Sequence, residues 1–341
     1  HGAHRAGRAQ FAGRSPEVTT CSPGSCGLDA SSGAGTGAHP GIGIGHPLRT
    51  AAGDRLLRGR RLMRLPLPNA QMEIEQMEVI DLKGRKGLVV GVANEQSIAW
   101  SAAQHFRNAG ADLAITYLND KAKPHVEPLA REAGASLILP CDVGEPVQME
   151  AVFDAITKKW GRLDFLVHAI AYSDRSELSG RYLETTRENF IQTLHISCFS
   201  FTDLARRASE LMTDGGAMLT LSFLGAHRVM PSYNVMGVAK AALETSVRYL
   251  AEDLGKDNIR VNAISAGPMR TLAGAVIADG RYVHKYAGEH APLRNGLDLG
   301  AVGNAGLYLL SDLSSAVTGE IMNVDNGLSL IGIPKPTSTS D

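Results

Sequence analysis

Cysteine is scarce in this chain of 341 residues, and long apolar runs are missing. The four cysteines have irregular spacing and form no CxxC pair; they are Cys21, Cys26, Cys141 and Cys198. This pattern gives no metal site and favours reduced thiols over a disulfide framework. No stretch approaches the roughly 18 uninterrupted apolar residues of a membrane span, and no apolar signal-peptide core opens the sequence. We therefore expect a cytoplasmic protein without a metal and without a membrane partner.

An excess of either charge is also lacking. The chain has 34 Lys and Arg against 35 Asp and Glu, which gives a net charge of -1. Such a balance does not favour nucleic acid or an anionic membrane as a partner. The length is sufficient for one large or two small domains with an ample core.

Residues 1–71 lack lysine altogether and differ in composition from the rest. They contain nine arginines and three acids, and low-complexity glycine stretches at residues 33–37 and 41–45. Such a segment buries too little apolar surface to offset its ordering entropy, so we predict disorder. Two origins stay open. The chain starts at a histidine, and Met72 and Met77 precede the first expected strand, which suggests a non-native extension; an Arg-rich organelle-targeting segment is the alternative.

Apolar strand-like runs alternate with helical periodicity from about residue 81 onwards. The expected strands span residues 87–92, 112–117, 136–141, 163–168, 217–222, 260–265 and 321–324. The expected helices span residues 97–108, 120–133, 145–160, 188–213 and 232–254. Continuous apolar strands between helices indicate a parallel sheet covered on both faces. We predict a single doubly wound α/β (Rossmann) domain over residues 79–333, followed by a flexible tail at residues 334–341.

The carboxyl ends of such strands form the ligand-binding crevice. Residues 91–99 lie between the first strand and the first helix but lack the GxGxxG glycines, so this motif alone is weak. Gly91 permits a tight turn, and Ser97 with the amides of the helix start can meet a pyrophosphate. The alternative for Ser97 is an ordinary residue at a helix N-terminus.

The second and third strands end in residues that bear on the choice of cofactor. Leu118 stands where an acid would hold the adenosine ribose, yet no arginine follows it to bind a 2′-phosphate. Because Lys121 and Lys123 are expected to face solvent on the next helix, NADH is favoured modestly over NADPH. Asp142 can receive the adenine amino group, with a simple strand-ending cap as the alternative.

Tyr233 and Lys240 are seven residues apart on an expected helix. Positions i and i+7 differ by only about 20° around a helix and lie about 10.5 Å apart along it, so both side chains share one face. A carbonyl reductase of the short-chain dehydrogenase type wants its tyrosine four residues before the lysine, where this chain has Met236. The spacing therefore favours a phenol that polarises a carbonyl other than the hydride acceptor. A chance pairing on an amphipathic helix is the alternative.

Several segments together resemble the FabI type of enoyl-(acyl-carrier-protein) reductase, within the short-chain dehydrogenase/reductase superfamily. The most specific are residues 221–226 (LSFLGA), 233–240 (YNVMGVAK) and 260–273 (RVNAISAGPMRTLA); residues 91–99, 142–143, 168–171 and 319–327 are similar too. The resemblance covers about residues 79–333. It implies a homotetrameric, NADH-dependent oxidoreductase of fatty-acid biosynthesis that reduces trans-2-enoyl thioesters on acyl carrier protein, the last step of each elongation cycle.

The resemblance also assigns roles to individual residues. Tyr233 would be the catalytic tyrosine, Lys240 would hold the nicotinamide ribose, and Ser173 would lie near the substrate. The residues expected to line the dinucleotide, besides Lys240, are Gly91, Ser97, Ile98, Leu118, Asp142, Val143, Ile170, Met269, Arg270, Thr271, Leu272 and Ala273. Many members carry a second tyrosine where this chain has Phe223, so Tyr233 is expected to act alone.

Residues 269–291 are rich in small and short apolar side chains, which is typical of a lid over an acyl pocket. Arg270, Arg281, His284 and Lys285 can meet an acidic carrier protein, with ordinary solvated charges as the alternative. Two other functions stay open for the whole chain: a short-chain reductase acting on a carbonyl, and a catalytically silent dinucleotide-binding protein.

Overall fold

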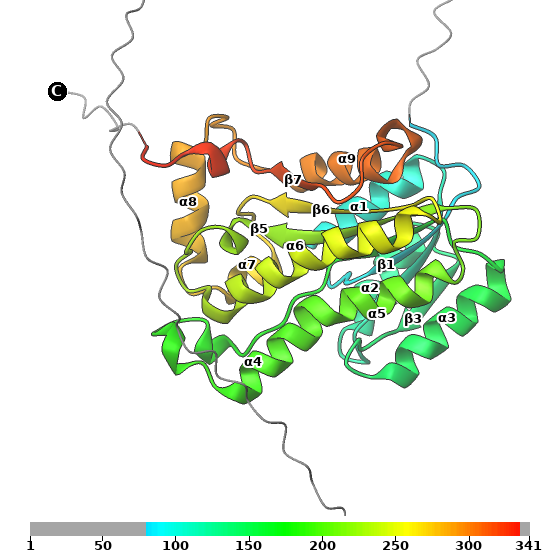
Figure 1. The fold of residues 1–341 in the computed structure, drawn as a ribbon, viewed down its shortest axis with the longest axis horizontal. Coiled ribbons are helices and arrows are strands. Elements are labelled where there is room, and N and C mark those ends of the chain that lie inside the picture. The colour runs from blue at the N-terminus through cyan, green and yellow to red at the C-terminus, as the bar shows by residue number, and fades with distance from the viewer. Residues whose placement is uncertain (1–79, 335–341) are drawn as a thin grey trace, which may run out of the picture. The chain divides into compact units, whose positions relative to one another are not determined.

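A computed structural model describes residues 80–334 of the chain. The predicted extension at residues 1–71 lies outside the described residues, as does nearly all of the predicted tail. The described strands form one parallel sheet in the order β3-β2-β1-β4-β5-β6-β7 (Figure 1). Their bounds are β1 (Lys86–Val90), β2 (Asp112–Tyr117), β3 (Leu137–Pro140), β4 (Phe165–His168), β5 (Gly216–Phe223), β6 (Ile259–Ala266) and β7 (Ile321–Val324). The predicted doubly wound fold is confirmed.

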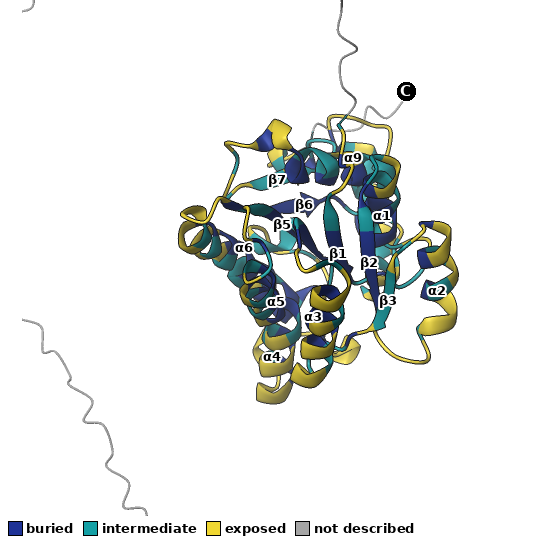
Figure 2. Cartoon of the chain, turned by 90° about the vertical axis from the view of Figure 1, so that its right-hand side faces the viewer, coloured by how far each residue is buried: buried dark blue, intermediate teal, exposed yellow. Residues whose placement is uncertain are grey.

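Helices cover both faces of the sheet, and the sheet is the most buried layer (Figure 2). On one face lie α1 (Ile98–Asn108), α2 (Lys123–Glu132) and α9 (Leu299–Leu310). On the other lie α3 (Pro146–Trp160), α5 (Ser200–Ser209) and α6 (Asn234–Gly255). Neighbouring residues of β1 supply both cores, since Val89 packs into the first and Leu88 and Val90 into the second. This alternation explains why the strands are apolar without interruption.

The remaining helices lie between the strands and at the carboxyl edge of the sheet. The predicted helix over residues 188–213 is divided into α4 (Arg187–Leu194), a π-helical turn (His195–Phe199) and α5. The predicted lid contains α7 (Leu272–Val276) and α8 (Gly280–His290), at the end of the sheet to which β6 and β7 point (Figure 1). The 3₁₀ turns are Arg175–Glu177, Tyr182–Glu184, Leu224–Ala226, Asp312–Ser314 and Leu328–Leu330. No helix within residues 80–334 has both the length and the apolar character needed to cross a bilayer.

The strand register aligns the carboxyl ends at one edge. Val90 pairs with His168 at the ends of β1 and β4, and Phe223 pairs with Ala266 at the ends of β5 and β6. The chain order reverses between β1 and β4, which makes this the switch point at which open α/β sheets bind ligands.

Candidate active site

The structure brings the predicted dinucleotide residues to the carboxyl edge of the sheet. Gly91 follows β1, Leu118 follows β2, Asp142 follows β3 and Ile170 follows β4. Because these four strands are neighbours, their ends form one continuous line of loops. The arrangement has the shape expected for an extended ligand such as a dinucleotide.

Gly91 allows β1 and β4 to end in close contact. Its φ is +112°, and a Cβ there would lie 2.3 Å from the Ala169 carbonyl oxygen, so a side chain does not fit. The loop after it leads to Ser97, the N-cap of α1, whose hydroxyl donates to the Asn94 carbonyl at 2.6 Å. No acid lies in the first turn of α1, which begins at Ile98. Free amides at a positive helix end fit a pyrophosphate.

The residues at the ends of β2 and β3 bear on the choice of cofactor. Leu118 is 51% exposed, as a residue lining an open crevice would be. Lys121 and Lys123 are both exposed, as predicted, and the Lys123 ammonium also lies 5.9 Å from the centre of the Tyr117 ring. One Asp142 carboxylate oxygen accepts from the Gly144 amide at 2.9 Å, which matches the strand-ending cap.

Tyr233 is buried at the start of α6. The predicted helix from residue 232 begins only at Asn234, and Tyr233 is its N-cap with φ -121°. Its ring packs against Phe223, with centroids 5.0 Å apart, and a Cβ on Gly225 would lie 2.4 Å from it. Burial, with a smaller contribution from the Glu244 carboxylate, raises the pKa of the phenol well above its ordinary value. The phenol is therefore a neutral hydrogen-bond donor at physiological pH.

Lys240 is also buried, with an exposed fraction of 5%. Its ammonium donates to the Leu221 carbonyl at the end of β5, at 2.7 Å. An ammonium has three donors, and this is the one hydrogen bond that it makes within the described residues, so the others suit ribose hydroxyls. Burial lowers the pKa of Lys240 to about 8, while the Cys198 and Glu244 charges act in the opposite direction.

Glu244 lies one helical turn after Lys240 and was not predicted as a site residue. It is almost fully buried, accepts from the Ser222 hydroxyl, and has the His227 ring nitrogen 2.6 Å from its second oxygen. It thus fastens α6 to the end of β5, next to the Leu221 carbonyl that receives Lys240. The only signal in the sequence is an acid four residues after the lysine, which is common on any helix.

His168 ends β4 and is fully buried. Its ring contacts the Thr220 and Ser200 hydroxyls at 2.7 Å and 2.9 Å. Burial, with a smaller effect of Lys240, lowers the pKa of His168 to about 3. The ring is therefore neutral, and its contacts join β4 to β5 and α5.

Ser173 lies in the segment between β4 and α4, with its side chain directed toward α4. Its hydroxyl donates to the Asn189 side chain at 3.3 Å and accepts from Thr193 at 2.9 Å. Asn189 also accepts from the Asp174 amide at 2.9 Å. Asn189, which was not predicted, therefore fixes the backbone around Ser173.

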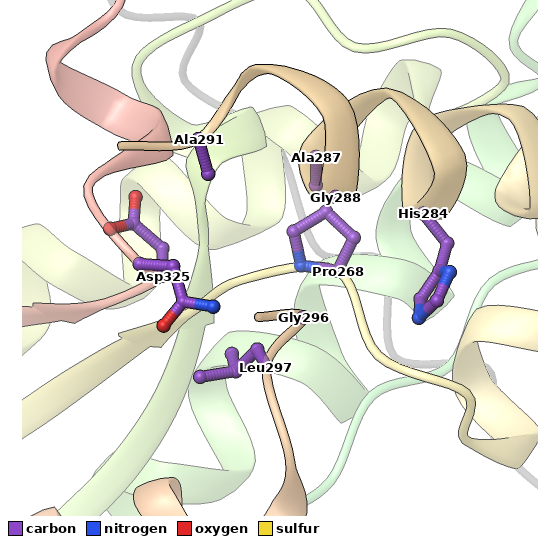
Figure 3. A pocket seen from close by; sticks show the side chains of 9 residues that line it. Pro268, His284, Ala287, Gly288, Ala291, Gly296, Leu297 and Asp325 are labelled. Atoms are coloured by element: carbon purple, nitrogen blue, oxygen red, sulfur yellow. The ribbon is translucent and has the colours of Figure 1, made fainter. Parts of the chain in front are cut away.

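The lid segment begins beside the crevice. Met269 packs against the first core, and the Thr271 hydroxyl caps α7 by accepting from the Gly274 amide at 3.0 Å. Arg270, Leu272 and Ala273 are exposed. On α8, Arg281 and Lys285 are exposed; His284 lies beside a cavity of only about 10 Å³ between α8 and the end of β7 (Figure 3). That space holds about one water molecule and no acyl chain.

Three comparisons place these features among known proteins. A family model described as enoyl-(acyl carrier protein) reductase matches residues 91–329. The chain is 55% identical over 252 residues to enoyl-(acyl-carrier-protein) reductase (NADH) 1 of Rhizobium meliloti, covering 74% of this chain and 93% of that protein.

Solved structures agree with the sequence matches. The enoyl-(acyl-carrier-protein) reductase of Anaplasma phagocytophilum in complex with NAD is 50% identical with a TM-score of 0.72, covering 74% of this chain and 97% of that one. The Bacillus cereus enoyl-acyl carrier protein reductase with NADP+ and an indole naphthyridinone is 44% identical with a TM-score of 0.73, covering 75% and 100%.

Proposed function

Because the chain belongs to the enoyl-(acyl carrier protein) reductase family, we propose that Tyr233 and Lys240 carry out its reaction at the carboxyl edge of the sheet. The protein is an NADH-dependent oxidoreductase that reduces enoyl-acyl-carrier-protein thioesters, the final step of the fatty-acid elongation cycle. The observation that supports these roles is the joint burial of the phenol and the ammonium beside the end of β5.

NADH, when bound, supplies the hydride that reduces the β carbon of the conjugated thioester. Negative charge then develops on the thioester oxygen, and the Tyr233 phenol donates a hydrogen bond to it. The raised pKa suits this role, because the phenol keeps its proton until charge develops. The enolate then takes a proton at the α carbon, from water or from the Tyr233 phenol, which completes the reduction.

Lys240 is assigned to the nicotinamide ribose. Its hydrogen bond to Leu221 fixes the side chain, so the remaining ammonium donors are oriented before the cofactor arrives. Gly91, Ser97 and the first amides of α1 are assigned to the pyrophosphate, since that helix end has no acid of its own.

The decisive assay measures NADH consumption by the purified protein of 341 residues with crotonyl or longer trans-2-enoyl thioesters. We expect turnover with these substrates and none with 3-oxoacyl thioesters. Reduction of 3-oxoacyl but not enoyl thioesters would identify a carbonyl reductase. Binding of NADH without oxidation by either substrate would identify a silent dinucleotide-binding protein.

We also propose a homotetramer. Large apolar side chains are exposed on α4, α6 and the π-helical turn, namely Ile191, Phe199, Val238 and Tyr249. Light scattering coupled to size-exclusion chromatography should give four times the monomer mass of 36.2 kDa. A monomer at micromolar concentration would contradict the proposal.

The catalytic domain is proposed to comprise residues 79–333, with residues 1–71 dispensable. The family model matches residues 91–329, which lie beyond the first 71 residues, and the match to the relative from Rhizobium meliloti spans 252 of the 341 residues. Deletion of residues 1–71 should leave kcat and the melting temperature unchanged; loss of either would refute the proposal. A cytoplasmic location is proposed with it, and a fluorescent fusion of residues 1–71 that enters an organelle would contradict it.

A further inference from the structure

Tyr233 stands between two residues with left-handed backbone. The φ angles are +51° at Ser232 and +33° at Asn234, against -121° at Tyr233. Residues with a side chain rarely adopt positive φ, and such conformations persist only where the surroundings hold them. The connection into α6 is therefore held in place by contacts on both sides of the tyrosine.

Ser232 is held by the lid segment. Its hydroxyl donates to the Asp279 carboxylate at 2.6 Å. Asp279 is the N-cap residue of α8, a position where an aspartate ordinarily accepts from the amides of its own helix. Its side chain makes no capping hydrogen bond. The Asp279 carboxylate thus accepts a hydrogen bond from Ser232 and none from the amides of α8.

Asn234 is held by the segment between β4 and α4. Its side-chain amide donates to the carbonyls of Glu177 at 3.0 Å and Ser179 at 3.4 Å. The Glu177 carboxylate in turn accepts from the Thr186 amide at 2.9 Å and from the Asn189 side chain at 3.1 Å. The carbonyl that receives Asn234 therefore belongs to a segment fastened to α4.

Each of these two segments also supplies an apolar contact. Leu178, adjacent to Glu177, is buried in one cluster with Tyr233, and Ile277, two residues before Asp279, packs against the same cluster. Each segment therefore makes two contacts near Tyr233. One is an apolar side chain that packs on the cluster around the phenol ring, and the other is a polar group that hydrogen-bonds to Ser232 or Asn234.

We propose that Ser232 and Asn234 are positioning residues for the reduction, which hold the Tyr233 phenol between the lid segment and the segment that follows β4. This inference rests on the proposed role of Tyr233. A donor to a developing oxyanion acts only when its oxygen is correctly placed, and displacements of about 1 Å cost up to about 10²-fold in rate. Neither residue lies among those assigned to NADH, so they should affect turnover and not cofactor affinity.

The test separates the side-chain contacts from the backbone angle. Glycine tolerates positive φ, so Asn234→Gly and Ser232→Gly remove only the side-chain hydrogen bonds. Alanine disfavours positive φ, so Asn234→Ala removes the hydrogen bonds and also strains the backbone. We expect kcat with an enoyl thioester to fall about fivefold in each glycine variant and about tenfold in Asn234→Ala, with the NADH dissociation constant within about twofold of wild type. Asp279→Ala should match Ser232→Gly, and Asp279→Asn, which keeps an acceptor oxygen, should retain more activity than Asp279→Ala.

Asn258 provides the matched control. It also has positive φ, at +57°, but it precedes β6 at the opposite edge of the sheet. Asn258→Ala should lower the melting temperature as Asn234→Ala does, with kcat per folded enzyme unchanged. If the glycine variants of Ser232 and Asn234 lose no more activity than Asn258→Ala, the inference is wrong.

A double variant tests whether Asn234 acts through the phenol. In the Tyr233→Phe background, Asn234→Gly should reduce kcat by less than about twofold, since the donor that it positions is gone. A fivefold loss in that background would assign Asn234 a general structural role and overturn the proposal. Wild-type enzyme that does not turn over enoyl thioesters would instead refute the proposed function itself.

Discussion

The two halves of the carboxyl edge are built differently. At the ends of β1 and β2 the site consists of backbone and of small or apolar residues, of which Gly91 and Leu118 are typical. At β4, β5 and α6 it is formed by buried polar side chains, including Lys240 and Glu244. A dinucleotide is recognised largely by helix amides and a close backbone approach, whereas charge development in a reaction needs donors at fixed points. We propose that this difference separates cofactor binding from chemistry.

The largest effect is expected at Lys240. Lys240→Ala removes the buried ammonium and its hydrogen bond to Leu221, so both NADH affinity and turnover should fall, with kcat/KM reduced by more than about 10²-fold. Fluorescence titration with NADH and steady-state kinetics measure the two parts separately. An unchanged NADH titration would show that Lys240 does not contact the cofactor.

Gly91→Ala tests the part of the carboxyl edge that is formed mainly by backbone. A Cβ would meet the Ala169 carbonyl, and the positive φ alone should cost about 1–3 kcal/mol of stability. We expect a lower melting temperature and NADH binding weakened by at least about tenfold. Ser97→Ala is the matched control, because it removes a hydroxyl and leaves the helix amides in place; it should change NADH affinity by less than about threefold. If Ser97→Ala weakened NADH binding as much as Gly91→Ala, the Ser97 hydroxyl, and not the backbone of this loop, would make the contact with NADH.

The pH dependence of kcat/KM should come from the buried polar side chains at β4, β5 and α6. Because the pKa of Lys240 is lowered to about 8, the ammonium is charged below that pH and neutral above it. If the charge holds the ribose, kcat/KM for NADH is flat at lower pH and falls by about tenfold per unit as pH rises beyond about 8. Burial raises the pKa of the Tyr233 phenol well above its ordinary value, so the phenol keeps its proton near pH 8. Burial also raises the pKa of the Cys198 thiol.

Lys240→Arg supplies the control for this profile, since a guanidinium stays charged throughout. The alkaline limb should disappear in this variant, even if its maximum rate is lower. An identical limb in both enzymes would assign it to another group.

Cofactor choice is the smallest expected effect. Without an arginine beside Leu118, a 2′-phosphate lacks a bidentate partner, so NADH should exceed NADPH in kcat/KM by about tenfold, or about 1.4 kcal/mol. The position of the Lys123 ammonium near Tyr117 weakens this preference and makes it testable. Lys123→Glu should widen the ratio by repelling the phosphate; an unchanged ratio would exclude Lys123 from the adenosine end.

The sequence predicted the described strands and most helices because continuous apolar runs and helical periods are local signals. It missed α9, whose Gly300, Gly303 and Gly306 argue against a helix by propensity. The structure explains these residues: a Cβ on Gly303 would lie 2.5 Å from the His105 ring, and Gly306 lies against Phe106. The glycines allow α9 to pack closely on α1, which is a tertiary requirement.

The part of the candidate site that could be predicted is the part with a local sequence signal, namely the seven-residue spacing of Tyr233 and Lys240. Tyr233 and Lys240 are both buried at the expected edge, although Tyr233 is an N-cap and not a helical residue. The roles of Glu244 and Asn189 were not predictable, because their contacts come from residues distant in sequence or from a turn that no pattern fixes. Asp142 had two interpretations in the sequence: its contact with the Gly144 amide fits the local cap, and its role toward the adenine stays a prediction.

The assignment of the chemistry to the phenol is tested most directly by Tyr233→Phe, assayed in parallel for NADH binding and for turnover of an enoyl thioester. The ring and its packing against Phe223 are retained, and only the donor is lost. We predict NADH affinity equal to wild type and kcat lowered by about 10²-fold or more. Near wild-type turnover by the folded variant would contradict the assignment.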